Sequence, residues 1–270
     1  MTQARVGVIG YGVVGEATAR LFDQPAIFDP PKGYDDPRVL MDCDIIFLAV
    51  PVPTELGKND LSIVHEVLDR ITPILRPDQI IAVRSTVLPG TVRALQAQYS
   101  GVRFASNPEF LRAHRAFEDA RHPYRVVIGA DEPEVAVRVA DVYRPRLDPR
   151  VEFVLTDSRT AEMIKYAANV FLALKISYMH EIWDACRALE IDYEVVKRGL
   201  ALDPRIGDGE ANEELDVRPA QLGFDDECLP KDLAAFIGFL RDELGLPATL
   251  PQATATVNAE MLSRRMALGD

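Results

Sequence analysis

The feature that most constrains the fold lies at the start of the chain, where a short strand pattern leads into a glycine-rich turn. Residues 5–9 alternate as a strand does and run straight into Gly10–Gly15 (G-Y-G-V-V-G), after which a helical pattern continues to Leu21. A lone G-x-G-x-x-G is weak evidence, but here a second strand pattern, residues 26–28, ends in an acid, Asp29. That order is typical of a dinucleotide-binding βαβ unit.

In such a unit the glycines allow a tight turn and let the backbone approach a pyrophosphate at the helix N-terminus. Asp29 stands at the spacing expected for a contact to the ribose hydroxyls, and its charge would repel a 2′-phosphate. The sequence therefore predicts NAD rather than NADP, with Lys32 as the one neighbour that weakens this preference. An ordinary tight turn between a strand and a helix is the alternative interpretation of the glycines.

The rest of the N-terminal half alternates strand and helix patterns, and the strands are apolar on both faces. Strands are predicted at residues 44–50, 80–83, 102–105, 125–128 and 151–155, and helices at 63–75, 91–98 and 133–143. This alternation predicts an α/β fold with a Rossmann-type, doubly wound parallel sheet. Beyond it the patterns are helical: a long central helix at about 160–189, then 193–200, 232–244 and 251–266. We expect an NAD-binding domain at 1–156 and an all-helical central and dimerisation domain at 157–270.

Three suggestive loops follow predicted strands, at Pro51–Thr54, Ser85–Gly90 and Asn107–Leu111. Ligands of doubly wound sheets bind at the carboxyl ends of the strands, so these loops are candidates for a binding edge. Prolines and hydroxyl residues also serve simply as turn formers, which is the plainer interpretation of each loop taken alone.

A second candidate site lies in the stretch Leu222–Asp232, L-G-F-D-D-E-C-L-P-K-D. Cys228 precedes a Pro-Lys-Asp that can open a helix, where unpaired N–H groups and an ammonium favour a thiolate. The alternative is a small buried filler, as most free cysteines are. On the long helix, Lys165 and Asn169 are four residues apart and share one face. Its apolar stripe (Met163, Ala167, Val170, Phe171, Leu174 and Tyr178) is expected to serve core or dimer packing.

Composition excludes several classes of protein. The net charge of −12 disfavours a non-specific nucleic-acid or membrane-surface binder. No apolar run approaches the roughly 20 residues needed to span a bilayer, and the early strand pattern is expected to leave no room for a signal peptide. The three cysteines are far apart, lack the spacing of a metal site, and predict a reducing, cytoplasmic compartment.

Taken together, these motifs resemble the UDP-glucose/GDP-mannose 6-dehydrogenase family, and they follow the family's order over almost the whole chain. The matching residues are Gly10–Gly15, Val50-Pro51 with Thr54, Ser85-Thr86, Asn107–Leu111, Ala161-Glu162 with Lys165 and Asn169, residues 203–207 (D-P-R-I-G), and Gly223-Phe224 with Cys228 and Pro230-Lys231-Asp232. The resemblance implies oxidation of a primary alcohol, of a sugar or nucleoside type, to a carboxylate by two NAD⁺ in turn. It implies that Cys228 traps the aldehyde as a thiohemiacetal that becomes a thioester.

The resemblance also implies residue roles. Lys165 and Asn169 would stabilise the oxyanion, and Asp232, Glu109 and Thr86 would orient or activate water. The expected cofactor contacts are Gly10, Gly12, Val13, Val14, Gly15, Asp29, Val50, Pro51, Thr54, Ser85, Thr86 and Lys231. The expected substrate contacts are Phe110, Leu111, Arg205 and Phe224. Arg205 matches a position that reaches a neighbouring subunit's substrate, which suggests a homodimer built on the long helix.

The chain departs from the family's pattern mainly around the substrate. It is expected to be a short member without the C-terminal UDP-binding domain, and Asp225-Asp226 stand where the family has Gly-Gly. An acidic segment is a poor cradle for a diphosphate, so the nucleotide-sugar grip is predicted to be lost or rebuilt, for a smaller, neutral or cationic substrate; alternatively, a partner subunit supplies the missing domain. Two other functions stay open: a two-electron β-hydroxyacid-type dehydrogenase, which needs no cysteine, and a non-catalytic NAD-binding module.

Overall fold

The computed structural model describes residues 4–203, 206, 216–218 and 221–269. The chain divides into two compact units, the first comprising Met1–Pro53 with Asn59–Lys165 and the second Thr54–Lys58 with Tyr166–Asp270. The domain boundary after residue 156 that the sequence suggests stays a prediction.

The first unit is built on a seven-stranded sheet with strand order β2-β1-β3-β6-β7-β8-β9. Its strands are β1 (Val6–Ile9), β2 (Ala26–Phe28), β3 (Ile45–Leu48), β6 (Ile80–Val83), β7 (Arg103–Ser106), β8 (Arg125–Gly129) and β9 (Glu152–Thr156). The first five strands in this order pair in parallel, as do β8 and β9. The predicted α/β fold class is confirmed.

The sheet differs from an all-parallel one at a single step, because β7 and β8 pair antiparallel, through Ser106 and Gly129. The helix between them, α4 (Ala116–Arg121), packs on α1 (Val13–Ala19) in a cluster of Ala17, Ala116 and Ala120. We attribute the antiparallel step to this packing: α4 lies on another helix instead of crossing the sheet, and a crossover is what a parallel pairing requires.

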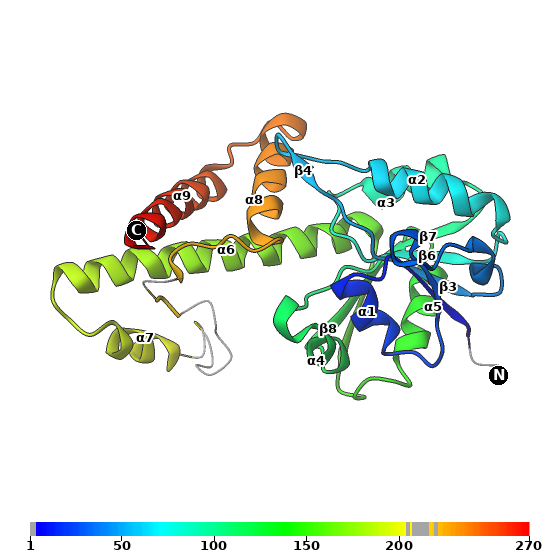
Figure 1. Ribbon diagram of the computed structural model, residues 1–270, viewed down its shortest axis with the longest axis horizontal. Coiled ribbons are helices and arrows are strands. Elements are labelled where there is room, and N and C mark those ends of the chain that lie inside the picture. The colour runs from blue at the N-terminus through cyan, green and yellow to red at the C-terminus, as the bar shows by residue number, and fades with distance from the viewer. Residues whose placement is uncertain (1–3, 204–205, 207–215, 219–220, 270) are drawn as a thin grey trace. The chain divides into compact units, whose positions relative to one another are not determined.

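Helices cover both faces of the sheet, which explains why its strands are apolar throughout. Alternate strand residues such as Val8 and Phe47 pack with α1 and with α5 (Pro133–Tyr143). Their neighbours, such as Ile46 and Leu48, pack with α2 (Ser62–Ile71) and α3 (Thr91–Gln98). Figure 1 shows α2 and α3 on one side of the sheet and α1, α4 and α5 on the other. Each fully buried large apolar side chain stabilises the unit by roughly 1.5–3 kcal/mol.

The second unit is helical. The long helix α6 spans Ser158–Ala188, close to its prediction, and the unit boundary falls within it, after Lys165. Asp157 begins α6, because its carboxylate accepts hydrogen bonds from the Thr160 backbone (3.1 Å) and hydroxyl (2.6 Å). The other helices are α7 (Tyr193–Ala201), α8 (Leu229–Gly238), which continues in a π-helical turn (Phe239–Glu243), and α9 (Thr249–Gly269). In the described parts of the chain, no helix is long and apolar enough to cross a membrane.

The predicted stripe on α6 is only partly covered within this chain. Phe171 and Tyr178 are 63% and 54% exposed, and Ala167 is exposed as well. Ala173, by contrast, is buried with Phe224 and Leu233. The core of this unit therefore uses a neighbouring face of the helix together with Val170 of the stripe, while Ala167, Phe171 and Tyr178 lie at the surface.

A short hairpin that the sequence did not predict, β4 (Thr54–Glu55) and β5 (Lys58–Asn59), contacts α8. Gly57 in its turn has φ +78°, and a Cβ on Gly238 would lie 2.2 Å from the Gly57 carbonyl oxygen. Backbone meets backbone at this point, so only glycine fits at Gly238.

Candidate active site

The glycine turn has the geometry that a dinucleotide requires. Gly10 has φ +81°, and a Cβ there would lie 2.5 Å from the Ala49 carbonyl oxygen. A Cβ on Gly15 would lie 1.8 Å from the Gly10 carbonyl oxygen. Gly12, at the start of α1, is exposed and has open space around its missing side chain. The two packed glycines therefore fix the turn while the third leaves it accessible, which fits a bound pyrophosphate.

Asp29 lies beside this turn, immediately after β2. It is buried, and its carboxylate accepts a hydrogen bond from the Tyr11 backbone N–H (2.6 Å). Lys32 donates from Nζ to the Tyr11 carbonyl oxygen (2.5 Å), so its ammonium is engaged on the same residue. The predicted cofactor residues Gly10–Gly15 (including Val13, which is exposed, and Val14) and Asp29 thus gather at one place, and they fit an NAD site.

Two of the predicted loops are joined at the carboxyl edge of the sheet. Leu48 of β3 pairs with Val83 of β6, so the segments that follow leave the sheet at the same edge. The Ser85 hydroxyl donates to the Val50 carbonyl oxygen (2.6 Å), which ties one segment to the other. Of the other predicted cofactor contacts there, Pro51 is exposed, Thr86 is half-buried, and Thr54 opens β4 in the second unit.

The third loop supplies a buried ion pair. Glu109 and Lys165 are 8% and 4% exposed, and Lys165 Nζ lies 3.0 Å from Glu109 Oε1. The other Glu109 oxygen accepts from the Leu111 backbone N–H (2.6 Å). Burial acts to raise the pKa of Glu109, but Lys165, the Leu111 N–H and the Arg84 charge outweigh it and hold the pKa below its usual value. Glu109 is therefore a carboxylate at neutral pH.

The two predicted substrate residues of this loop have different surroundings. The Phe110 ring is half-buried and lies near two cations, the Arg125 guanidinium 4.0 Å and Lys165 Nζ 5.3 Å from its centroid. Leu111 packs against the cluster of Ala17, Ala116 and Ala120.

Beneath the loop lies a buried polar network that sequence reasoning missed. Arg84 Nη1 donates to Asn107 Oδ1 (3.0 Å) and lies 3.0 Å from the Tyr143 hydroxyl, which donates to the same Asn107 oxygen (2.8 Å). Asn107 Nδ2 donates to the Val127 carbonyl oxygen (2.8 Å). Among the described residues, Arg84 Nε is a buried N–H without a partner. An arginine at the end of an apolar strand was the available signal, since a buried charge must be paired.

In the second unit, Cys228 occupies the position that the sequence suggests, at the N-terminal cap of α8, and it is exposed. Pro230 stands in the first turn of the helix, as expected. Asp226 Oδ1 accepts from the Cys228 and Leu229 N–H groups, each at 2.7 Å, and Asp225 forms an ion pair with Arg265 of α9. Both acids of the unusual Asp-Asp pair are thus engaged within the unit.

One turn into α8, the structure brings three further predicted residues together. Asp232 is 1% exposed and accepts from Asn169 Nδ2 of α6 (2.7 Å) and from Lys231 Nζ (2.6 Å). Such charge-assisted bonds are about twice as strong as neutral ones. The bond from Asn169 holds the start of the Cys228 helix against α6.

The segment before Cys228 is held by two residues that sequence reasoning did not single out. Asn258 of α9 accepts from the Phe224 N–H (2.7 Å) and donates to its carbonyl oxygen (3.0 Å). His180 Nε2 accepts from the Gly223 N–H (3.1 Å) while Nδ1 lies 2.7 Å from the Ile176 carbonyl oxygen. Burial lowers the pKa of His180, in keeping with a neutral ring protonated at Nδ1. Nothing in the sequence pattern marked either residue.

The predicted residues therefore gather in distinct groups: the turn with Asp29, the Val50–Ser85 contact and Glu109 with Lys165 in the first unit, and Asn169 with Lys231 and Asp232 near Cys228 in the second. Phe224 is buried in the core of the second unit. The prediction for Arg205 falls outside the described residues.

Comparison with known proteins identifies the domains that carry these groups. The NAD binding domain of the UDP-glucose/GDP-mannose dehydrogenase family matches residues 34–147, and the central domain of the same family matches 159–260. A UDP-glucose 6-dehydrogenase of Rickettsia typhi is 36% identical over 71% of this chain and 44% of its own length. One from Rhizobium meliloti is 35% identical over 84% of this chain and 52% of its own. The chain spans about half the length of these curated relatives.

Among solved structures, a UDP-glucose dehydrogenase from Pyrobaculum islandicum superposes with a TM-score of 0.83 and 29% identity, over 96% of this chain and 68% of that one. The two family domains follow one another along the chain and together match most of it. It follows that this chain, with its NAD-binding and central domains, belongs to the UDP-glucose/GDP-mannose dehydrogenase family.

Proposed function

We propose that the protein is an NAD-dependent dehydrogenase that oxidises the primary alcohol of a nucleotide-linked sugar to a carboxylate, in the manner of UDP-glucose 6-dehydrogenase. The observation that carries the proposal is the exposed Cys228 at the start of α8, one helical turn before a buried Asp232 held by Asn169 and Lys231. A thiol at the N-terminus of a helix is favoured as thiolate.

NAD⁺, held by the Gly10–Gly15 turn and Asp29, would supply the hydride acceptor, with one NAD⁺ for each of the two oxidations. The alcohol loses a hydride and a proton to give an aldehyde, and the Cys228 thiolate adds to its carbonyl carbon, whose oxygen takes up a proton to complete a thiohemiacetal. Loss of a second hydride and a proton converts this adduct to a thioester. Water adds to the thioester carbon, the C–S bond breaks, and the carboxylate leaves while Cys228 is restored.

The candidate catalytic residues divide the remaining work by their chemistry. Lys165 is an ammonium and Asn169 an amide donor, so we assign both to the oxygen that becomes negative in each addition. Glu109, held as a carboxylate, is the candidate base for the attacking water, with Asp232 and Thr86 as orienting groups. Gly12, Asp29, Ser85 and the other predicted cofactor residues would bind NAD, and Phe110, Leu111, Arg205 and Phe224 are the proposed substrate contacts.

The objection raised by the Asp-Asp pair is weaker once its contacts are known. Asp225 is paired with Arg265, and Asp226 accepts two N–H bonds at the start of α8. The charge of Asp225 is balanced by Arg265, and Asp226 keeps its charge but directs it at two N–H groups, so the pair repels a diphosphate less than two unpaired carboxylates would. We therefore favour a nucleotide sugar over a smaller neutral or cationic alcohol.

We further propose a homodimer through α6. The exposed Phe171 and Tyr178 lie seven residues apart, or about two turns, on one face of this helix. Large apolar side chains that share an exposed face suit an interface with a second copy. The cytoplasm is the proposed location, supported by the sparse and widely spaced cysteines.

The test is NADH release per substrate by the wild type and by Cys228→Ser, with UDP-glucose, GDP-mannose, free sugars and nucleosides as substrates. Cys186→Ser, which alters a buried thiol in the same unit, is the matched control. We expect two NADH per nucleotide sugar in the wild type and in the control, with acid release lost in Cys228→Ser. One NADH per substrate, unaffected by Cys228→Ser, would favour the two-electron alternative. No NADH with any substrate, together with measurable NADH binding, would favour a non-catalytic module.

A further inference from the structure

Glu162 is a buried acid that the proposed chemistry does not use. It lies in the first turn and a half of α6, is 1% exposed, and points both carboxylate oxygens at the start of α3. Oε2 accepts from the Gly90 N–H at 2.5 Å and Oε1 from the Val92 N–H at 2.8 Å. These N–H groups belong to the unpaired donors at a helix N-terminus, where a negative charge is favoured.

What Glu162 holds is the far end of the Ser85–Gly90 segment, the one expected to contact the cofactor. The near end of that segment is fixed by the Ser85 hydroxyl on the Val50 carbonyl oxygen. The far end turns at Gly90, which has φ +104° and leads directly into α3. Thr86 lies between the two attachments, so its position depends on both.

The same stretch of α6 also holds the neighbouring loop. Lys165, three residues beyond Glu162, forms the ion pair with Glu109 in the Asn107–Leu111 loop. Residues three apart on a helix lie on one face. A rigid piece of helix thus grips two loops at the sheet edge, one through an anion and the other through a cation.

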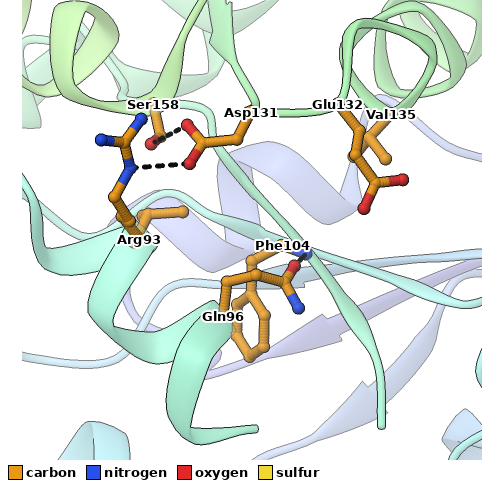
Figure 2. Close-up of a pocket in the computed structure, with 8 residues that line it drawn as sticks. Arg93, Gln96, Phe104, Asp131, Glu132, Val135 and Ser158 are labelled. Carbon is orange, nitrogen blue, oxygen red and sulfur yellow. Dashed lines mark hydrogen bonds and ion pairs between the residues drawn. The ribbon is translucent and has the colours of Figure 1, made fainter. Parts of the chain in front are cut away.

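The charged groups around Glu162 come from three elements. Arg93 of α3 pairs with Asp131, which follows β8, and Asp131 accepts from the Ser158 hydroxyl at 2.9 Å (Figure 2). Asp157 lies immediately before α6, and Lys165 lies one turn after Glu162 in the same helix. Arg93 lowers the pKa of Asp131, and Thr160 lowers that of Asp157, so neither acid changes charge near neutral pH. Burial raises the pKa of Glu162 itself to about 7, against the Val92 and Gly90 N–H groups, which lower it.

We propose that Glu162 is a positioning residue for the cofactor: in its ionised form it clamps the Gly90 turn, and through it sets the affinity of the Ser85–Thr86 segment for NAD. This inference rests on the proposed function, because it takes that segment to contact NAD. The clamp acts only from a distance and touches no reacting atom. A carboxylate accepts both N–H bonds better than the neutral acid, so the clamp tightens as pH rises through neutrality.

The test compares Glu162→Gln with Glu181→Gln, which makes the same charge change at an exposed position of the same helix. Glutamine keeps the shape, but its NH₂ cannot accept, so one of the two backbone N–H groups loses its partner. Glu162→Asp, which keeps the charge but shortens the reach, serves as the second variant in case Glu162→Gln does not fold. Amide hydrogen exchange at Gly90 and Val92 is measured without cofactor, and NADH binding by its fluorescence from pH 6 to 9.

We expect faster exchange at Gly90 and Val92 in both Glu162 variants and about tenfold weaker NADH binding, as the loss of one charge-assisted hydrogen bond predicts. The wild type and Glu181→Gln should bind NADH more tightly as pH rises through about 7, and Glu162→Gln should lose this dependence. Unchanged exchange would overturn the clamp. Faster exchange with unchanged NADH affinity would overturn its link to the cofactor. A wild type that binds no NADH at all would overturn the proposed function, and the cofactor role of Glu162 with it, while the exchange rates still report on the contact itself.

Discussion

At the scale of single residues, the Glu109–Lys165 pair shows that the candidate site contains two buried charges. Both groups are nearly fully buried, and their hydrogen bonds are short: 3.0 Å to each other and 2.6 Å from Glu109 to the Leu111 N–H. Burying two charges removes both from water, and their mutual attraction offsets that only when the geometry is good. Such a pair is weak evidence for a stabilising role and better evidence for a functional one.

Removing one partner should therefore be costly. We expect Glu109→Gln to lower the free energy of unfolding by about 3 kcal/mol, because Lys165 is left as a buried ammonium without its counter-charge. The double variant Glu109→Gln/Lys165→Met should recover part of that loss, since the lone charge is gone. Urea denaturation of both variants measures the difference. Equal losses in the single and the double variant would mean that the pair's charges are not what matters.

The same residue predicts a direction of pH dependence. Glu109 has a folded-state pKa below its ordinary value of 4.5. Its contribution to stability is therefore fully present above about 4.5 and is lost as pH falls through the lower folded-state value. Urea midpoints from pH 3 to 7 should show a smaller decline in Glu109→Gln than in the wild type. An identical decline would assign the acid sensitivity to other carboxylates.

At the scale of elements, close contacts fix α8 at both of its ends. Its N-terminus is held through Asp226 and through Asp232 with Asn169, and its C-terminal end meets the hairpin where Gly238 touches the Gly57 backbone. Cys228 therefore stands at the start of a helix that is fixed at both ends. This is the support that a nucleophile needs if its geometry is to be reproducible.

Two glycines allow a matched test of the contact between Gly238 and the Gly57 backbone. Gly238→Ala should destabilise the protein by about 1–3 kcal/mol or more, because the new Cβ would overlap the Gly57 backbone and the two segments must separate. Gly199→Ala, in α7 and with open space around it, should stabilise by up to about 1 kcal/mol. Thermal unfolding compares them, and a Gly238→Ala that matches Gly199→Ala in sign would show that the hairpin yields easily.

His180 gives the segment before Cys228 a pH dependence of its own. Its pKa lies below the ordinary 6.5, so its neutral form is the one that fits the folded state. Stability from this site is present above about 6.5 and is lost as pH falls toward the lower folded-state value, where a proton on Nε2 would face the Gly223 N–H. We expect hydrogen exchange at Gly223 to accelerate between pH 7 and 5 in the wild type. His180→Gln, whose side chain does not titrate, should show no such acceleration once intrinsic exchange is subtracted.

At the scale of the whole molecule, the sequence patterns predicted the α/β class, most strands and helices, and the place of Cys228 at the start of a helix. Residues 80–83, 91–98 and 133–143 form the predicted elements with the predicted bounds. Long apolar runs and the residues at helix ends act on the local chain, so they predict an element without knowledge of its distant contacts.

What the patterns could not supply depends on contacts between distant segments. The antiparallel step at β8 follows from α4 packing on α1, and the hairpin depends on the Gly57–Gly238 contact. Hydrogen bonds join Asn258 to Phe224 and Glu162 to Gly90, which are 34 and 72 positions apart in the sequence. No local periodicity marks such partners, and a single sequence gives no means of pairing them.

The proposed dimer is a prediction at this scale. Phe171→Glu combined with Tyr178→Glu should shift the protein toward monomer in light scattering, because two charges would replace apolar side chains on the exposed face of α6. Glu181→Gln, on the same helix, should leave the mass unchanged. A double variant with the mass of the wild type would place any self-association on another surface.

The opening turns of α6 also limit how this chain can change over evolution. Glu162 and Lys165 reach two different loops from one helix face. An insertion or deletion of one residue between them would rotate one group by about 100° relative to the other. A single substitution between Glu162 and Lys165 leaves both side chains on the same face. A change of length does not, because only one of the two residues could still reach its loop. Relatives of this protein should therefore vary freely in length along the surface loops and not at all across these four positions, a pattern that an alignment of close homologues can reveal without any measurement on the protein itself.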